Sequence, residues 1–230
     1  MPAFKRFLVF GALAASLPAF AHEPGQIIVR IGATAVAPHD KSDNLALDNQ
    51  SLSLSGGHSG LSVNSNVQLG AAIAYQVDKQ FSVELLAATP FHHVVSGTGE
   101  LQGLDIAKVR HLPPTLSLIY HFPETANLQP YVGAGINYTT FFKQELTAAG
   151  AAALDGLGLH NGRVDADNSW GLALQVGADY HLTPSLLLNA SVRWIDIKTK
   201  VTLSFANGSQ LSTKLDVDPF VYSLGLGLVF

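Results

Sequence analysis

The chain has 230 residues, of which 47% are hydrophobic and only 13% are charged, and it contains no cysteine. That length fits one domain, whereas a soluble protein usually has about a quarter of its residues charged. The net charge of -4 argues against a nucleic-acid partner, because neutralising phosphates requires a basic surface. Without cysteine the chain has no disulfide, no thiolate metal ligand and no thiol nucleophile.

Residues 1–21 have the pattern of a cleavable signal peptide. Lys5 and Arg6 precede the apolar run FLVFGALAASL, which is too short to span a membrane as a helix. The triplet AFA at 19–21 supplies the small residues that a signal peptidase requires. We therefore expect an exported protein whose mature chain comprises residues 22–230; an uncleaved N-terminal anchor is the alternative.

In the rest of the chain, apolar residues alternate with small or polar ones. From Phe220 to Phe230, every second residue is aromatic or leucine, and Ser223, Gly225 and Gly227 share the opposite face. The same period of two recurs at 67–75, 81–86 and 172–180. Long strands with one apolar face, a glycine-rich opposite face and aromatic residues at their ends are typical of an outer-membrane barrel.

The connections between these strands are of two kinds that alternate along the chain. Short turns are expected at 77–80, 123–127 and 182–185, and longer polar or glycine-rich segments at 38–60, 96–104, 146–164 and 206–210. This alternation predicts an all-β protein, an up-and-down, antiparallel transmembrane β-barrel of eight strands with both termini in the periplasm. So small a barrel is not a wide aqueous pore, which needs about 16 strands.

Several segments resemble the OmpW/AlkL family of eight-stranded outer-membrane barrel proteins. They are VELLAATPFHH from Val83, HLPPTL from His111, PYVGAGINYTTFF from Pro130, SWGLALQVGADY from Ser169 and the closing VDPFVYSLGLGLVF. The resemblance implies a lumen that is hydrophobic in its outer part and blocked toward the periplasm. It also implies that small hydrophobic molecules enter from outside and leave sideways into the membrane. The segments at 40–60 and 147–162 match no motif of the family, so the cargo itself is not implied.

The resemblance further implies that Leu86 and Trp170 narrow the lumen. The alternation of side chains between the two faces of a strand supports this for Leu86, which shares the inward face with Glu84. Trp170, in contrast, falls in phase with the lipid-facing Leu172, and only a bulge near residue 171 would turn it inward. Whether Trp170 faces the lumen or belongs to an aromatic girdle is left open by the sequence.

The same alternation of strand faces places four charged residues inside the barrel. They are Arg30, Glu84, Asp179 and Arg193, each on a different strand. Isolated charges in such an interior are costly, so residues of opposite sign should pair. We interpret the four as an interior polar plug that fixes strand register and blocks water, with a proton or ion pathway as the alternative.

Pro113 and Pro114 stand side by side near the start of the strand-like stretch HLPPTLSLIYHF. Proline has no backbone N–H, so the pair removes two consecutive donors from the wall. One interpretation places both prolines at the rim above the membrane, where an interrupted ladder costs little. The other, favoured by the resemblance, makes them a lateral opening through which an apolar cargo reaches the lipid.

Metal and enzyme chemistry are weakly indicated. His92 and His93 are adjacent and point to opposite faces of a strand, so even with His111 nearby we expect no metal site. An enzyme would need a converging set such as Ser169, Asp167 and His160, residue types that every barrel rim offers. We therefore expect neither an enzyme nor a cofactor.

The expected function is passive uptake of small hydrophobic molecules through the outer membrane of a Gram-negative bacterium, with lateral release into the membrane. The alternative is a surface receptor for a bacteriocin or phage, or a structural or stress-related barrel without transport. Expected partners are outer-membrane lipids and lipopolysaccharide, small hydrophobic solutes, and the barrel-assembly machinery, for which the terminal Phe230 is the expected assembly signal.

Overall fold

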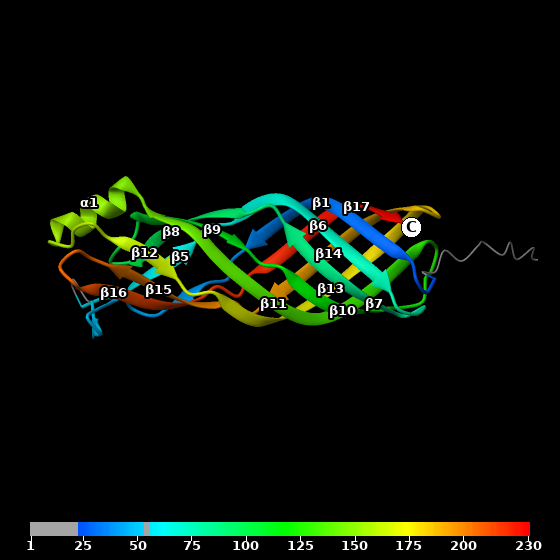
Figure 1. The fold of residues 1–230 in the computed structure, drawn as a ribbon, viewed down its shortest axis with the longest axis horizontal. Coiled ribbons are helices and arrows are strands. Elements are labelled where there is room, and N and C mark those ends of the chain that lie inside the picture. Colours follow the sequence, from blue (N-terminus) through cyan, green and yellow to red (C-terminus); the bar gives the residue numbers. More distant parts are fainter. Residues whose placement is uncertain (1–22, 53–55) are drawn as a thin grey trace, which may run out of the picture.

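Eight antiparallel strands close into a barrel in the computed structural model, which describes residues 23–52 and 56–230 (Figure 1). The wall strands are β1 (Ile27–Ala37), β6 (Asn66–Gln76), β7 (Phe81–Ala88), β10 (Thr115–His121), β11 (Leu128–Leu146), β13 (Ser169–Thr183), β14 (Leu186–Ile195) and β17 (Phe220–Val229). They pair in the order β10-β7-β6-β1-β17-β14-β13-β11, and β10 pairs with β11 to complete the ring. The expected barrel is confirmed, whereas the expected signal peptide lies outside the described residues.

The barrel wall continues beyond one end as an extension that the sequence did not predict. β11 runs for 19 residues and pairs there with β9 (Asp105–Leu112), which is followed by β8 (Phe91–Gly99) and β5 (Ser59–Val63). A second sheet joins β12 (Arg163–Ala166), β15 (Lys198–Ser204), β16 (Gln210–Asp216), β3 (Ala46–Leu47) and β4 (Gln50–Ser51), with β2 (Lys41–Ser42) against β16. Two segments expected to be loops, 38–60 and 146–164, thus contain strands and a helix.

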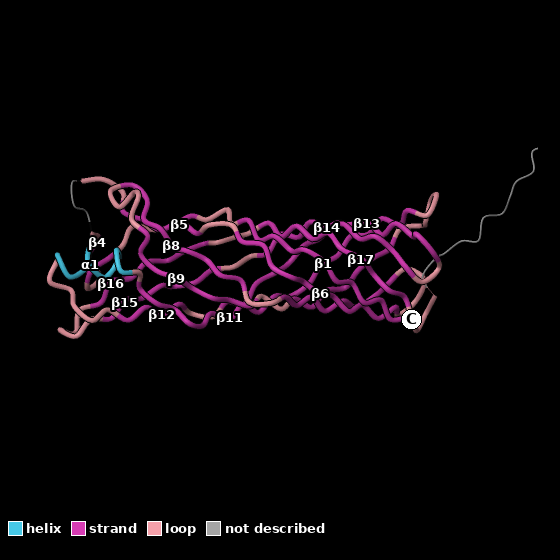
Figure 2. Tube along the Cα trace, turned by 90° about the horizontal axis from the view of Figure 1, so that it is seen from above, coloured by secondary structure: helices cyan, strands magenta, loops and turns pink. Residues whose placement is uncertain are grey.

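The helix α1 (Ala148–Gly156) lies at the tip of this extension, far from the short turns that close the opposite end of the barrel (Figure 2). Its first turn is capped by Thr147, whose side-chain oxygen accepts a hydrogen bond from the Gly150 N–H at 2.9 Å. Leu154 on α1 is buried, which docks the helix onto the apolar interior. Among the described residues, no helix is long and apolar enough to cross a membrane.

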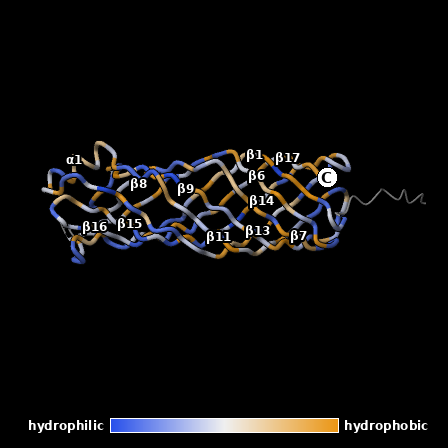
Figure 3. Tube along the Cα trace, viewed as in Figure 1, coloured by the Kyte–Doolittle hydropathy of each residue, from blue (hydrophilic) through white to orange (hydrophobic). Residues whose placement is uncertain are grey.

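Hydrophobic residues are frequent along the strands of the closed barrel (Figure 3), and the large ones lie on its outside. In β7, Phe81, Val83 and Leu85 are exposed, whereas Ser82 and Glu84 are buried in the lumen, as the period of two predicts. Large aliphatic side chains cover the same outer face on the other strands, each between 46% and 63% exposed: Ile31, Leu69, Ile73, Leu116, Leu118, Ile136, Leu172, Leu174, Leu224 and Leu226. So continuous an apolar surface requires a lipid environment.

The largest hydrophobic core lies in the extension rather than in the closed barrel. It joins residues from the connecting segments, such as Leu45 and Leu154, to strand residues such as Phe91, Val201 and Leu215. In the closed barrel the inner face carries glycine where strands approach closely: a Cβ on Gly32 would collide with the backbone of Leu224. The lumen therefore has a polar half inside the closed barrel and an apolar half inside the extension.

Candidate functional site

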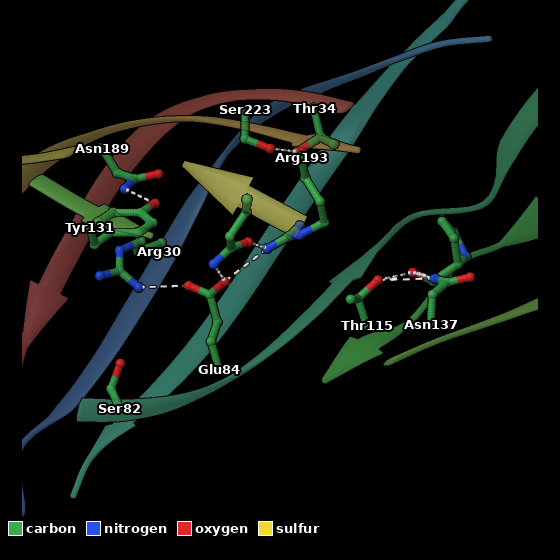
Figure 4. A network of polar contacts seen from close by, with 12 residues as sticks. Arg30, Thr34, Ser82, Glu84, Thr115, Tyr131, Asn137, Asn189, Arg193 and Ser223 are labelled. Atoms are coloured by element: carbon green, nitrogen blue, oxygen red, sulfur yellow. Dashed lines mark hydrogen bonds and ion pairs between the residues drawn. The ribbon is translucent and has the colours of Figure 1, made fainter. Parts of the chain in front are cut away.

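A network of buried charges crosses the lumen of the closed barrel (Figure 4). Arg30 of β1 donates through Nη1 to Glu84 Oε2 of β7 at 2.9 Å and through Nη2 to Asp179 Oδ2 of β13 at 2.6 Å. Arg193 of β14 donates through Nη2 to Glu84 Oε1 at 2.9 Å. All four side chains are almost fully buried. Two cations and two carboxylates thus neutralise one another across four strands.

Polar side chains around the charges extend the network. The Gln175 side-chain amide donates to Glu84 Oε1 at 3.1 Å, and the Asn189 amide donates to Asp179 Oδ1 at 2.7 Å and to the Tyr131 hydroxyl at 2.9 Å. Buried charges are tolerated when further hydrogen bonds satisfy their remaining donors and acceptors. The network therefore ties strands on different sides of the barrel together across the lumen and lines a cavity of about 30 Å³.

Above the network the lumen widens into two adjoining apolar cavities. The lower one, of about 40 Å³, has His93, His111 and Phe141 among its lining residues. The upper one, of about 220 Å³, lies beneath α1 and is lined largely by leucine, valine and alanine. Four residues line both cavities: Val95, Val109, Ala166 and Val201. The two adjoining cavities, called the apolar passage below, lie inside the extension, and small apolar molecules are the ligands that such a surface suits.

The lower cavity contains a pair of histidines that contact each other. His93 Nδ1 lies 2.6 Å from the carbonyl oxygen of Asn64, which only accepts, so Nδ1 carries the proton and Nε2 is an acceptor. His111 Nε2 lies 3.0 Å from His93 Nε2 and must therefore donate to it. The rings of Phe91 and Phe141 lie against His111, with centroids 5.5 and 5.8 Å away.

This environment favours neutral imidazoles. Burial lowers the pKa of His111 to about 3, and burial also lowers the pKa of His93. His92 is exposed on the opposite face of β8 and does not join the pair. Among the described residues, no group of three or more His, Cys, Asp or Glu side chains could hold a metal ion.

Pro113 and Pro114 connect β9 to β10 within the wall, where the side chain of Asn137 on β11 replaces the missing ladder. The Asn137 amide donates to the Pro113 carbonyl at 3.0 Å, to the Pro114 carbonyl at 3.1 Å and to Thr115 Oγ1 at 3.0 Å. The Tyr138 N–H donates to the Pro114 carbonyl at 3.1 Å. On the β11 side the interruption is therefore bridged by protein groups.

Within the part of the chain that the structure describes, the other side of the two prolines has no such bridge. β7 pairs with β10 up to Leu86 and Thr115, and β8 pairs with β9 from Phe91 and His111 onward. Neither ladder pairs residues 87–90 with residues 112–114. A third proline, Pro90, stands in the first of these segments. Paired strands continue above the prolines in β8 and β9, so the wall does not end at the prolines.

Comparison with known proteins agrees with this architecture. The sequence model of the OmpW family matches residues 23–230. The chain belongs to the OmpW family. It is 43% identical to outer membrane protein W of Vibrio cholerae over 95% of both chains. Its fold is similar to the crystal structure of OprG from Pseudomonas aeruginosa, with a TM-score of 0.82, 35% identity, and coverage of 92% of this chain and 99% of OprG.

The outer membrane protein AlkL, solved in lipid bilayers, is a further structural relative of this OmpW-family chain. The TM-score is 0.66 at 29% identity, covering 100% of this chain and 97% of AlkL. The protein is therefore an outer-membrane barrel of a Gram-negative bacterium. The short-turn end faces the periplasm and the extension with α1 faces outward, because barrels of this type carry short periplasmic turns.

The structure of this OmpW-family barrel separates the two expected constriction residues. Leu86 is buried in the lumen, opposite Thr115 in the β7–β10 ladder. Trp170 is a correction: it is 71% exposed on the outer face, and its ring packs against Tyr138 with centroids 4.7 Å apart. β13 keeps its register with β11 through Gly171 without a bulge, so the indole never turns inward. Trp170 belongs to the interfacial girdle and does not narrow the lumen.

The remaining candidates of the OmpW-family chain lie apart from the lumen network. His160 pairs with Asp155 at 2.9 Å near the outer tip, whereas Ser169 accepts a hydrogen bond from the Lys198 N–H at 3.1 Å. Asp167 accepts a hydrogen bond from Thr199 through its backbone carbonyl. These hydrogen bonds therefore join the three residues to other partners and not to one another. Phe230 ends the last strand on the outer face, where its N–H donates to the Ile27 carbonyl at 2.9 Å.

Sequence reasoning missed three features of the site. Asn137 is an inward-facing residue beside a glycine-rich strand segment, and its parity alone would have placed it in the lumen. Pro90, in the stretch ATPF, also lacks a backbone N–H and could have been recognised in the same way as Pro113 and Pro114. No local signal could reveal the contact between His93 and His111, because each lies on its own strand and only the register of β8 with β9 brings them together.

Proposed function

We propose that this barrel admits small hydrophobic molecules from outside into the apolar half of its lumen and releases them sideways through the wall at Pro113 and Pro114. One observation carries the proposal: the two apolar cavities lie in the outer half of the lumen, and the buried charge network lies between them and the periplasmic end. A molecule that has entered the passage meets Arg30, Glu84 and their partners on the axial route, where desolvated charges exclude apolar and aqueous solutes alike.

The side route begins close to the floor of the passage. His111 lines the lower cavity and lies two residues before Pro113, where the ladder toward β7 and β8 is interrupted. Leu86, at the last β7–β10 pair below the interruption, is an apolar side chain that narrows the lumen there. Beyond the wall lie the lipid-facing Leu116 and Leu118. An apolar molecule moving outward at this level exchanges one apolar environment for another, at little free-energy cost.

The partners in this proposal are the lipids and lipopolysaccharide of the outer membrane, small hydrophobic solutes, and the assembly machinery that reads the strand ending in Phe230. Transport needs no cofactor and no energy source, because the apolar solute moves down its own gradient. The apolar tunnel spares that solute from crossing the hydrated, charged layer of lipopolysaccharide.

Uptake measurements test the proposal. Cells with and without the protein are given a radiolabelled alkane and, separately, an alkyl ester, and initial uptake rates are compared. The barrel should raise both rates, and a charged molecule of similar size should enter equally slowly in both strains. Equal rates for the apolar compounds would overturn the proposal and favour a surface receptor or a structural barrel.

A further inference from the structure

A second site lies on the outside of the wall, where the strands leave the lipid. A groove of about 290 Å³ is lined by His92, His93 and Val94 of β8, by Lys108, Val109 and Arg110 of β9, and by Lys143 and Glu145 of β11. His93 also faces the lumen, but Lys108, Arg110 and Lys143 are exposed on the outer face. The groove is thus a cationic surface made by three neighbouring strands.

The backbone of β11 is shaped to bring the third cation to this groove. Phe142 pairs with Arg110 and Glu145 pairs with Lys108, so two residues of β11 stand against one of β9. Such a bulge redirects a side chain. Lys143 occupies it with a φ of 49°, in the left-handed region that a lysine seldom adopts. On regular strands, a third outward cation would not stand next to Lys108 and Arg110.

The three cations lack carboxylate partners. Within the described part of the chain, none of Lys108, Arg110 and Lys143 forms an ion pair, although other exposed lysines do, such as Lys198 with Asp196 at 2.8 Å. Glu145 is the carboxylate among the residues that line the groove. It stands opposite Lys108 in the pairing of β11 with β9, but the two described side chains form no ion pair. The groove therefore carries an excess of positive charge that an external anion can neutralise.

The depth of the groove indicates which anion is available. Along β10 and β9 the outward residues are Leu118, Leu116, Pro114, Leu112 and then Arg110, so the cations begin where the apolar band ends. Trp170 and Tyr138 mark the same boundary on the neighbouring wall. In the outer leaflet of an outer membrane, the groups at this level are the phosphorylated sugars of lipopolysaccharide.

We propose that Lys108, Arg110 and Lys143 form a binding site for the phosphate groups of lipopolysaccharide, with His92 at its edge. Arginine binds phosphate through two parallel hydrogen bonds, and the lysines add charge from either side. The apolar residues below the groove contact the acyl chains of the same lipid. The site does not depend on transport, so the uptake experiment and the one below can fail separately.

Titration of the folded barrel in detergent micelles with purified diphosphorylated lipid A tests the site. The variant K108Q/R110Q/K143Q should bind at least about tenfold more weakly than the wild type, because it removes three charge-assisted contacts to phosphate. Lipid A that lacks one phosphate should bind the wild type more weakly than the diphosphorylated form. Raised salt should weaken the wild type more than the variant.

The matched control is K200Q/R163Q/K214Q, which removes two lysines and one arginine from outward positions of the second sheet. It should bind lipid A within about twofold of the wild type. Heat-modifiable migration verifies folding, and R110Q alone replaces the triple variant if that variant does not assemble. Wild-type affinity in the groove variant would overturn the proposal. Displacement of lipid A by millimolar inorganic phosphate would also overturn it, since the site would then bind small anions and not the lipid.

Discussion

Glu84 holds both buried arginines of the lumen. Its two carboxylate oxygens accept hydrogen bonds from Arg30 and Arg193, each at 2.9 Å, and it is 3% exposed. Asp179 bonds to Arg30, and among the described residues Glu84 is the carboxylate that contacts Arg193. A buried charge without a partner costs far more free energy than a pair contributes.

Replacing Glu84 with Gln should therefore lower the free energy of unfolding by about 3 kcal/mol, because Arg193 is left with no carboxylate. Urea unfolding of the barrel in lipid vesicles measures the change. Glu145→Gln, an exposed residue of the same type, is the control and should leave the unfolding midpoint unchanged. An E84Q midpoint equal to that of the wild type would mean that water enters the network and solvates the arginine.

His111 makes the outer half of the barrel sensitive to acid. The unfolded histidine binds a proton below a pKa of about 6.5, whereas the buried one has a pKa of about 3. Between these values the unfolded state binds more protons, so this group lowers stability progressively as pH falls from 6.5 to 3. Burial lowers the pKa of His93 as well, which acts in the same direction.

Hydrogen exchange of the β8 and β9 amides measures this effect. Local opening should be easier by about 2 kcal/mol at pH 5 than at pH 8, after correction for the intrinsic exchange rates. His111→Phe should remove most of that difference, whereas His92→Gln, on the exposed face, should keep it. Equal corrected protection at both pH values in the wild type would contradict the neutral pair.

At the scale of elements, β9 and β10 form one strand that is interrupted by Pro113 and Pro114. The interruption is asymmetric: Asn137 bridges it toward β11, while the side toward β7 and β8 has no paired residues across it. A closed barrel survives the loss because the ladders resume above and below. The proposed exit lies on the unbridged side.

Replacing both prolines with Val restores two N–H donors and should let the unbridged ladder close. Uptake of the labelled alkane should fall to the rate of cells without the protein, while barrel assembly and heat-modifiable migration persist. Pro130→Val serves as the control, since Pro130 is a wall proline near the periplasmic end, opposite Ala178. Unchanged uptake in a well-assembled double variant would show that the cargo leaves by another route.

At the scale of the whole molecule, the lumen is divided into a charged half inside the membrane and an apolar half outside it. The membrane half is held by ion pairs, and the outer half by a hydrophobic core to which the connecting segments contribute. Ala166 lies where the two apolar cavities meet. Blocking that junction separates the outer tip from the wall opening without touching the membrane strands.

Ala166→Phe should therefore abolish most uptake of the apolar solute while the barrel still assembles, because the new ring fills the passage between the cavities. Ala134→Phe adds the same side chain to the lipid face of β11 and should leave uptake at the wild-type rate. The two variants are compared in the same alkane assay at equal surface amounts. An A166F rate equal to that of A134F would place the route outside these cavities.

The sequence by itself determined the class of fold and the face on which each strand residue lies. Alternation is a property of neighbouring residues, so the lipid face of β17 and the inward direction of Arg30, Glu84, Asp179 and Arg193 follow from parity alone. The position of Leu86 in the lumen follows in the same way. For Trp170 parity was right, and the role implied by family resemblance was not.

Only the tertiary structure decided which inward residues meet. Arg30 and Asp179 are 149 positions apart, and their contact depends on strand order and register around the whole ring. The same holds for Asn137 beneath the prolines, for the pairing of His93 with His111, and for the extension that turns connecting segments into an apolar core. These contacts join distant parts of the chain, and local periodicity carries no information about register between strands that are far apart in sequence.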